Sequence, residues 1–382
     1  MDALELSDQA ERAVAAGELQ RAISLLQQVA ALRPDDITNW MKIAAMYRGL
    51  GDIATALVSV QRALAVVPLD FTALLMRASL LQRLGDPAAG EAWGHALAQK
   101  PADPPAELAP VIAQAESHHT AWVTQREADM KRRLAAAEGH ADGDERQRIR
   151  RFRDNVLRRT RPYHSEPTHY HFPALPEREF HPRSLFPWLD HLEAATSAIT
   201  AELEQVMRAE RAELVPYVQY EDYLPMDQWR ALNRNRDWTA IHLLEKGSVV
   251  DANAAHCPQT MALLAQMPQP QISGASPNAM FSLLAPCTAI PPHVGISNTR
   301  LVCHLPLIVP DGCWFRVGAE TRYWKAGEAF VFDDTIEHEA LNPSDQLRVV
   351  FIFDIWAPDL TPPEREAVAA VIGLAPAEDG GL

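Results

Sequence analysis

Glycine and proline recur at a nearly fixed interval in about the first hundred residues, and this spacing constrains the fold more than any other feature. A glycine permits the tight turn that joins two helices, and a proline ends the second helix before the next unit begins. Alanines at matching sites, such as Ala22 and Ala56, let paired helices approach closely. The period therefore predicts stacked pairs of antiparallel helices. The recurring residues, 33 or 34 positions apart, are Gly17, Gly51 and Gly85, and Pro34, Pro68 and Pro101.

The spacing resembles the tetratricopeptide repeat, whose unit is 34 residues of paired antiparallel helices. Two repeats are clear, a third is degenerate, and weaker helical segments continue to about residue 135. Solenoids of this kind are general scaffolds for packing or peptide binding. The repeats therefore predict an α-solenoid over residues 1–135 without indicating an activity.

The bulk composition narrows the classes of function. At 382 residues the chain is too long for one ordinary core, so two or three domains are expected. The net charge of −15 argues against general nucleic-acid binding and favours a soluble, cytoplasmic chain. The first residues lack the pattern of a signal peptide, and no apolar run is long enough for a membrane span. The four cysteines show no metal-binding spacing and are expected to be free thiols.

Residues 136–182 are predicted to link two domains. Residues 146–161 hold eight arginines and one aspartate, which indicates either the solvated face of a connecting helix or a docking surface for an acidic partner. Residues 161–182 contain five prolines and are expected to be extended. His164, His169 and His171 in this stretch are weak metal candidates, because they form no helical pair and have no cysteine partner.

From about residue 210 the chain changes to short β-rich runs bounded by Gly, Pro, Asn or Asp, which predict an all-β sandwich or barrel. Helical periodicity before the strands and a helix with early prolines at 361–375 predict flanking helices. Residues 183–376 are therefore expected to form a β domain, so that the chain combines α and β domains. Trp314, Trp324 and Trp356 in this region are assigned to core packing.

Two histidines and one arginine in the predicted strands carry the chemical signal. His293 opens one strand, and His338 follows an acidic turn 45 residues later. Arg348 lies inside the apolar strand LRVVFIFDIW, where a guanidinium is expensive to bury unless it meets an anion. Neutral imidazoles at strand ends beside a buried arginine suggest an iron site that holds a dicarboxylate cosubstrate. Gly295 stands two residues after His293, where a common iron motif has an aspartate.

The stretch HVGISNTRLVCHLPL, residues 293–307, and the segment from Gly312 to Arg365 resemble the aspartyl/asparaginyl β-hydroxylase family. The resemblance extends over roughly residues 165–372 and is densest between 280 and 360. It implies a double-stranded β-helix oxygenase domain, jelly-roll or cupin-like, that depends on Fe(II), 2-oxoglutarate and O₂. Members of this family lack an iron-binding carboxylate and carry a glycine in its place, which is the pattern of Gly295.

The resemblance also implies roles for individual residues. Arg300 is expected near the substrate carboxylate or, as a strand arginine, in an internal ion pair. Val302 stands where the animal enzyme has a second arginine, which leaves the contact to the inner carboxylate of 2-oxoglutarate open. Asp333, Asp334 and Glu337 are expected to orient ligands or simply to form a turn. The implied iron ligands are His293 and His338, the implied cosubstrate contacts are Arg348, Ser282 and His304, and Trp238 is expected to line the substrate cleft.

The function expected from this resemblance is hydroxylation of the β-carbon of Asp or Asn residues in a peptide or protein, with release of succinate and CO₂. The helical repeats are expected to help present that substrate. Two alternatives stay open: an oxygenase that acts on a small molecule or a peptide natural product, and a non-catalytic repeat adaptor with a degenerate oxygenase shell. The sequence leaves open the substrate, the choice between Asp and Asn, the stereochemistry and the oligomeric state.

Overall fold

The computed structural model describes residues 2–209, 214–221, 223 and 228–374. Contacts divide the chain into two compact units, Met1–Leu157 and Arg158–Leu382. None of the helices in the described ranges combines the length and the apolar character that crossing a membrane requires. All four cysteines are free thiols, and three of them are buried.

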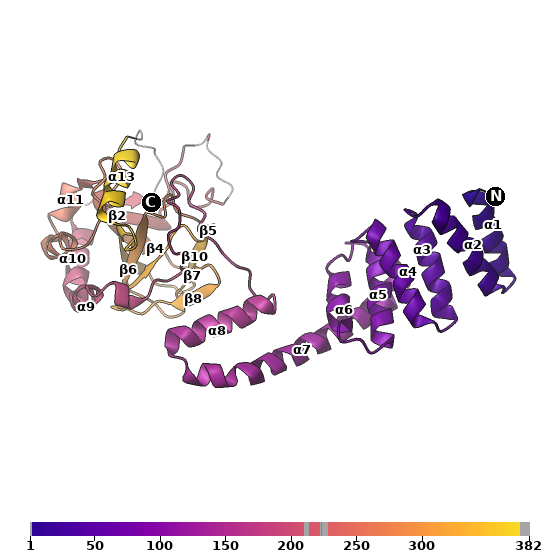
Figure 1. Cartoon of the computed structure of the whole chain (residues 1–382). Helices are drawn as coiled ribbons and strands as arrows, with labels where there is room; N and C mark the ends of the chain where they lie inside the picture. Colours follow the sequence, from indigo (N-terminus) through magenta and orange to yellow (C-terminus); the bar gives the residue numbers. More distant parts are fainter. Residues whose placement is uncertain (1, 210–213, 222, 224–227, 375–382) are drawn as a thin grey trace. The chain divides into compact units, whose positions relative to one another are not determined.

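Consecutive helices of the first unit pack as pairs, as the 34-residue period predicts (Figure 1). Gly17, Gly51 and Gly85 occupy the turns inside the pairs with φ of 75°, 83° and 69°, a region that residues with a side chain rarely adopt. Ala22 and Ala56 are fully buried at the helix contacts. The predicted helix pairs are confirmed, including the degenerate third. The pairs are α1 (Ala3–Ala15) with α2 (Leu19–Leu32), α3 (Ile37–Gly49) with α4 (Ile53–Val66), and α5 (Phe71–Arg83) with α6 (Ala89–Leu97).

The predicted linking segment of residues 136–182 is divided between the two units. Helix α7 (Ala109–His140) and the arginine-rich α8 (Gly143–Val156) belong to the first unit. Residues 158–182 belong to the second unit and form isolated bridges to its strands. These bridges join Ser165 to Ile336, Tyr170 to Ser297, and Phe180 to Phe332.

The described part of the second unit contains eleven strands, most of them short. They are β1 (Val215–Pro216), β2 (Trp238–Glu245), β3 (Ser248–Val249), β4 (Ala279–Leu284), β5 (Thr288–His293), β6 (Arg300–Ile308), β7 (Trp314–Val317), β8 (Glu320–Tyr323), β9 (Phe330–Phe332), β10 (His338–Asn342) and β11 (Arg348–Trp356). The larger sheet has the order β1-β2-β4-β11-β6-β9, with β3 on β2, and the smaller has the order β5-β10-β7-β8. All pairings between these strands are antiparallel.

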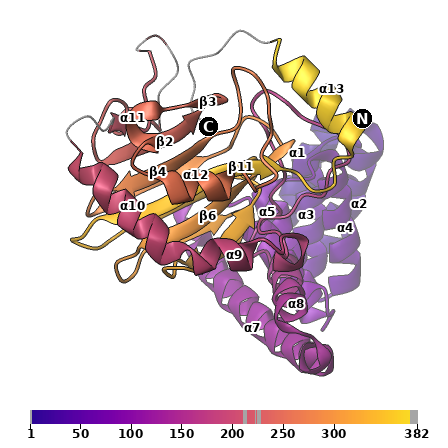
Figure 2. The same ribbon diagram turned by 90° about the vertical axis from the view of Figure 1, so that its left-hand side faces the viewer.

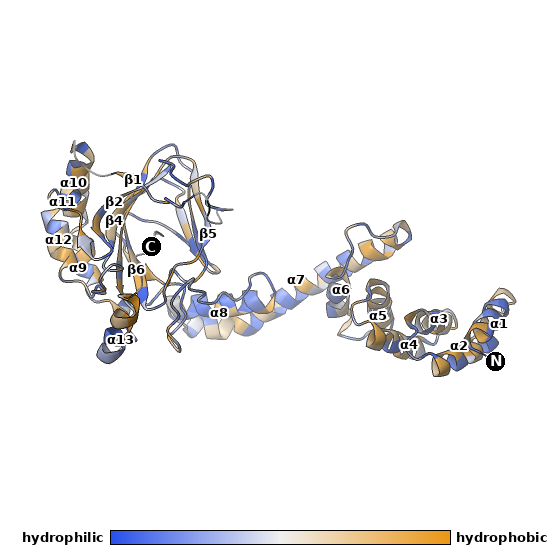
Figure 3. Ribbon diagram, turned by 90° about the horizontal axis from the view of Figure 1, so that it is seen from above, coloured by the Kyte–Doolittle hydropathy of each residue, from blue (hydrophilic) through white to orange (hydrophobic). Residues whose placement is uncertain are grey.

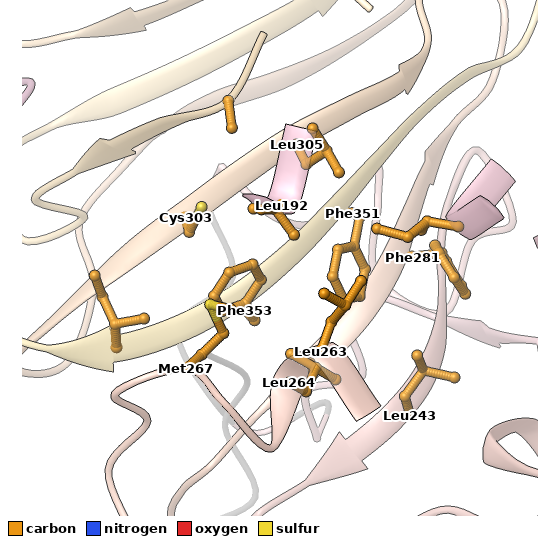
Figure 4. Packing of buried hydrophobic residues seen from close by; sticks show 14 of the residues in the cluster. Leu192, Leu243, Leu263, Leu264, Met267, Phe281, Cys303, Leu305, Phe351 and Phe353 are labelled. Carbon is orange, nitrogen blue, oxygen red and sulfur yellow. The ribbon is translucent and has the colours of Figure 1, made fainter. Parts of the chain in front are cut away.

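Helices cover one face of the larger sheet (Figure 2). Phe351 and Phe353 of β11 point to that face and pack with Phe281 and with leucines of the helices (Figure 4). This covered face explains why the central strands are nearly continuous apolar runs rather than strictly alternating ones. The helices are α9 (Leu189–Ala194), α10 (Thr196–Arg208) and α12 (Pro258–Leu264), and the closing helix is α13 (Pro362–Ile372).

The other face of the larger sheet is turned toward the smaller sheet (Figure 3). Because side chains alternate along a strand, β11 directs Val350 and Ile352 to this face, and Arg348 follows the same alternation. Apolar residues of both sheets meet there, including Val302 of β6 and Phe315 of β7. The predicted β domain with flanking helices is therefore confirmed, as two facing antiparallel sheets.

Candidate active site

A cavity of about 700 Å³ is lined by residues of both sheets of the second unit. The seven residues that the sequence nominated as metal ligands, cosubstrate contacts or substrate contacts all line this cavity, although they come from six different strands. The fold thus brings together side chains that lie up to 110 positions apart in the chain. These residues are Trp238, Ser282, His293, Arg300, His304, His338 and Arg348.

His293 and His338 face each other directly across the antiparallel pair β5–β10, and their ring centroids are 4.0 Å apart. Each ring uses Nδ1 to contact the carbonyl oxygen two residues earlier, Pro291 at 2.8 Å and Ile336 at 3.1 Å. A proton on Nδ1 leaves the lone pair on Nε2, the form in which an imidazole binds a metal. Burial lowers the pKa of His293 to about 3 and that of His338 to about 4, so both rings are neutral near pH 7.

No protein carboxylate joins the histidine pair: the described residues contain no group of three or more His, Cys, Asp or Glu side chains placed to hold a metal. The position of Gly295 explains this in part, because a Cβ built there would overlap the carboxylate of Asp334. The backbone N–H of Gly295 also donates to the carbonyl oxygen of Asp334 at 2.7 Å. The space beside the missing side chain is therefore filled by Asp334 rather than left empty.

Arg348 is a buried cation without a carboxylate partner within 4.0 Å among the described residues. It is 2% exposed, its Nη1 lies 3.4 Å from both the hydroxyl and the carbonyl oxygen of Ser282, and its Nε finds no hydrogen-bond acceptor in the described chain. The guanidinium stacks 4.5 Å from the ring of Trp324, so Trp324 lines the cavity and is more than the packing residue that the sequence suggested. Burial lowers the pKa of Arg348 to about 10. A guanidinium left in this state is suited to a bound anion.

Two neighbours complete the surroundings of Arg348. Trp238 donates its indole N–H to the hydroxyl oxygen of Ser282 at 3.0 Å, and both side chains are buried. His304 lies between the rings of Phe315 and Phe332, and its Nδ1 has no partner among the described residues. Burial, reinforced by the charge of Arg348, holds the pKa of His304 well below its ordinary value, so this imidazole is neutral.

Arg300 differs from Arg348 because it has a carboxylate partner. Its Nη2 lies 3.1 Å from Oδ2 of Asp334, and both side chains are buried. Burial alone would lower the pKa of Arg300, but the carboxylates of Asp334 and Asp354 outweigh this effect and raise it. Of the three acids named from the sequence, only Asp334 lines the cavity. Glu337 instead contacts Arg161 and Arg316. Asp333 accepts hydrogen bonds from the backbone N–H and the hydroxyl of Thr335.

An aromatic wall that sequence reasoning did not find lies beside the histidine pair. Tyr217 stacks on Trp238 with ring centroids 3.7 Å apart, and Trp229 meets His293 edge to face at 4.9 Å. Tyr217 and Trp229 come from a stretch in which the described residues form one strand, β1, of two residues, so no periodic pattern marked them. Among the weak candidates, His169 lines the cavity, whereas His164 contacts Glu177 with an exposed ring.

Comparisons with known proteins find similarity to hydroxylases. Residues 193–358 match the family model described as aspartyl/asparaginyl beta-hydroxylase. Human aspartyl/asparaginyl beta-hydroxylase is 30% identical over 187 residues, 48% of this chain and 24% of that protein. Human aspartate beta-hydroxylase domain-containing protein 2 is 36% identical over 135 residues, 35% of this chain and 37% of that protein. The ornithine lipid ester-linked acyl 2-hydroxylase of Rhizobium tropici is 34% identical over 193 residues, 50% of this chain and 64% of that protein.

These matches and the cavity between the two sheets define the second unit as an oxygenase domain of the hydroxylase type. Residues 193–358 are similar to the aspartyl/asparaginyl β-hydroxylase family, and the first unit carries tetratricopeptide-like helix pairs. The matched region spans less than two thirds of each of these relatives.

Solved structures also share a likeness with part of the chain. The type III secretion chaperone SycD of Yersinia enterocolitica, bound to a peptide of the translocator YopD, is 17% identical and matches 32% of this chain and 92% of its own, with a TM-score of 0.29. The Sgt2 TPR domain of Aspergillus fumigatus is 19% identical and matches 33% of this chain and 81% of its own, with a TM-score of 0.28. Scores this low carry no argument, and the helix-pair architecture rests on the packing of α1 to α6 itself.

Proposed function

We propose that the protein is an Fe(II)- and 2-oxoglutarate-dependent dioxygenase that hydroxylates the β-carbon of an Asp or Asn residue in a peptide or protein. The observation that carries the proposal is one cavity that holds both a pair of neutral imidazoles and a buried arginine without a counter-charge. An iron site needs the first and a dicarboxylate cosubstrate needs the second. A degenerate shell would have no reason to keep either.

The donor set fits both groups. Two imidazoles with Nδ1 turned to backbone carbonyls would offer Nε2 to the metal and leave the remaining positions to small ligands. The guanidinium of Arg348 and the hydroxyl of Ser282 match the distal carboxylate of 2-oxoglutarate. When bound, iron and 2-oxoglutarate supply an oxidant made from O₂, with release of succinate and CO₂.

The chain's own residues bind the metal and the cosubstrate and orient them. His293 and His338 hold the metal, Arg348 and Ser282 hold the distal carboxylate, and His304 lies toward the cosubstrate's other end. Asp334, held by Arg300, stands beside His293 where it can orient a small ligand. The aromatic wall of Tyr217, Trp229 and Trp238 limits the access of water to the reacting carbon.

The proposal is tested by incubating the full chain with Fe(II), 2-oxoglutarate and O₂ and measuring succinate, with and without a peptide library followed by mass spectrometry for one added oxygen. Succinate formation that depends on iron and rises with a hydroxylated peptide supports the proposal. If no iron and no 2-oxoglutarate bind, the chain is a repeat adaptor instead. On the acidic composition of the chain we place the reaction in the cytoplasm, with the helical repeats engaging the peptide.

A second candidate is hydroxylation of an acyl chain. It is favoured by the Rhizobium relative, an ornithine lipid ester-linked acyl 2-hydroxylase, which is matched over 64% of its length at 34% identity. A cavity of about 700 Å³ with an aromatic wall can take an apolar chain. Acyl lipids presented in detergent micelles distinguish the two candidates: hydroxylated lipid without any hydroxylated peptide favours this one.

A further inference from the structure

We infer that the substrate presents an uncharged carbonyl group, and not a carboxylate, beside Arg300, so that a peptide substrate is hydroxylated at asparagine in preference to aspartate. The inference rests on the proposed function, because it assigns Arg348 to the cosubstrate and leaves Arg300 for the substrate. It is carried by the charges that line the cavity, by a buried ion pair and by the unsatisfied donors of Arg300.

The charge of Arg300 is already matched within the protein. Its partner Asp334 lies 3.1 Å away, and the two side chains are 7% and 6% exposed, so little water screens the pair. A second carboxylate, Asp354, adds to the negative potential on Arg300. Asp354 is 1% exposed and is fixed by Ser276 and by the backbone N–H of Asn278. An incoming carboxylate would therefore meet Asp334 at the cavity wall and a cation whose charge is already matched.

Among the described residues, the rest of the wall offers no replacement cation near the histidines. Val302, two residues along the same strand and on the same face, is apolar and buried. Trp238 is the neighbour of His293, and Lys246 lies eight residues further along the chain. Eight residues of extended strand span roughly 25 Å. With Arg348 holding the cosubstrate, a substrate carboxylate would stay buried and unmatched, which proteins avoid. The charged residues that line the cavity are Lys246, Arg300, Arg348, Glu221, Glu245 and Asp334.

Arg300 nevertheless keeps a free donor. Neither Nη1 nor Nη2 has a hydrogen-bond partner in the described chain, although Nη2 lies within ion-pair distance of Asp334, and the side chain is 6% exposed and lines the cavity. A neutral carbonyl oxygen accepts such an N–H without adding a charge, as the side-chain amide of asparagine does. A carboxylate could accept the same N–H, but it would bring a buried charge that this site leaves unmatched, and the cost of desolvating that charge disfavours it.

The test uses the full chain loaded with Fe(II) without O₂ and saturated with N-oxalylglycine, a non-reacting analogue that occupies the Arg348 end. Binding of N-acetyl-asparagine methylamide and N-acetyl-aspartate methylamide, isosteres that differ by one charge, is measured by titration calorimetry near neutral pH. We expect the asparagine probe to bind at least about tenfold more tightly. A tighter aspartate probe, equal affinities, or no binding of the asparagine probe up to its solubility overturns the inference.

Two variants tie the preference to the ion pair. Asp334→Asn leaves Arg300 without its counter-charge, and Val302→Arg adds a cation to the same wall, so each is expected to shift the preference toward the aspartate probe by about tenfold or more. Asp333→Asn is the matched control, since this buried acid is one residue away, accepts from Thr335 and does not line the cavity. A control that shifts the preference as much as Asp334→Asn does contradicts the assignment to Arg300. Failure of N-oxalylglycine to bind wild-type protein contradicts the proposed function instead, whatever the probes do.

Discussion

Two buried arginines line the same cavity and start from opposite ends of the strand pair β6–β11, yet their surroundings differ. Arg300 has a carboxylate at 3.1 Å, whereas Arg348 contacts, within the described residues, two oxygens of Ser282 at 3.4 Å and the face of a tryptophan. The pKa of Arg300 is raised by its acids, and that of Arg348 is lowered by burial to about 10. The difference is the one that the proposed function requires: Arg348 is left unmatched for the charge of the cosubstrate, and Arg300 is paired within the protein.

The largest loss of activity is expected from the two histidines, because the contacts of Arg300 and Arg348 contribute to turnover only if the metal site works. His293→Ala and His338→Ala are each expected to lower 2-oxoglutarate turnover at least about 1000-fold, about 4 kcal/mol in the barrier. Succinate formation measures the loss, and thermal unfolding of the metal-free protein shows whether the fold survives. Wild-type turnover in either variant would remove that histidine from the metal site.

Arg348→Met removes the buried guanidinium that has no carboxylate partner in the described chain. Its removal deletes the hydrogen bonds to the distal carboxylate, so the Kd of 2-oxoglutarate is expected to rise about 100-fold. The stability of the ligand-free protein should stay equal or increase, because the guanidinium was buried without a counter-charge. Calorimetry and denaturant unfolding check the two halves separately. An unchanged Kd would place the cosubstrate elsewhere.

Arg300→Met sharpens the comparison by giving the opposite stability result. It leaves Asp334 buried without its cation, and the free energy of unfolding is expected to fall by about 3 kcal/mol near pH 7. Burial raises the pKa of Asp334, so protonation relieves the unpaired charge, and the deficit shrinks as pH falls. The double variant Arg300→Met/Asp334→Leu should recover most of the loss in urea unfolding. Equal stability losses for Arg300→Met and Arg348→Met would contradict the distinction between the two arginines.

The sequence could predict the parts of this site that leave a local pattern. The 34-residue period predicts the helix pairs, and the apolar neighbours of Arg348 in its strand are enough to mark this arginine as unusual. The match of Arg300 to Asp334 could not be predicted, because it depends on how β6 and the turn before β10 meet across 34 residues. The aromatic wall could not be predicted from the sequence for a related reason. Tyr217 and Trp229 belong to irregular chain, where side-chain direction follows from tertiary packing alone.

Gly295→Asp tests whether the position of Gly295 has room for a metal-binding carboxylate. A vacancy at this position would let the new aspartate improve iron affinity. The structure predicts the opposite, because the added Cβ overlaps the carboxylate of Asp334 and brings a second negative charge. We expect a loss of about 2 kcal/mol in unfolding free energy and no gain in iron affinity. Gly295→Ala adds the Cβ without the charge and should cost less than Gly295→Asp. Its cost should disappear in an Arg300→Met/Asp334→Ala background, where neither the overlapping carboxylate nor an unpaired guanidinium remains. A stable, tighter-binding Gly295→Asp protein would contradict this.

The smallest effect concerns the indole of Trp238, which acts on Arg348's end of the cavity through Ser282. The serine oxygen already accepts from the indole at 3.0 Å and faces the guanidinium of Arg348 at 3.4 Å, so its own hydrogen is directed away from both and toward a bound carboxylate. Trp238→Phe keeps a ring against Tyr217 but removes the donor, which releases the hydroxyl to rotate toward other acceptors. The Kd of 2-oxoglutarate is expected to rise about fivefold, about 1 kcal/mol. Trp229→Phe trims the same aromatic wall at His293 and should leave that Kd unchanged. A fivefold rise in both variants would mean that the wall acts by bulk packing, and Ser282 would then need no orienting partner.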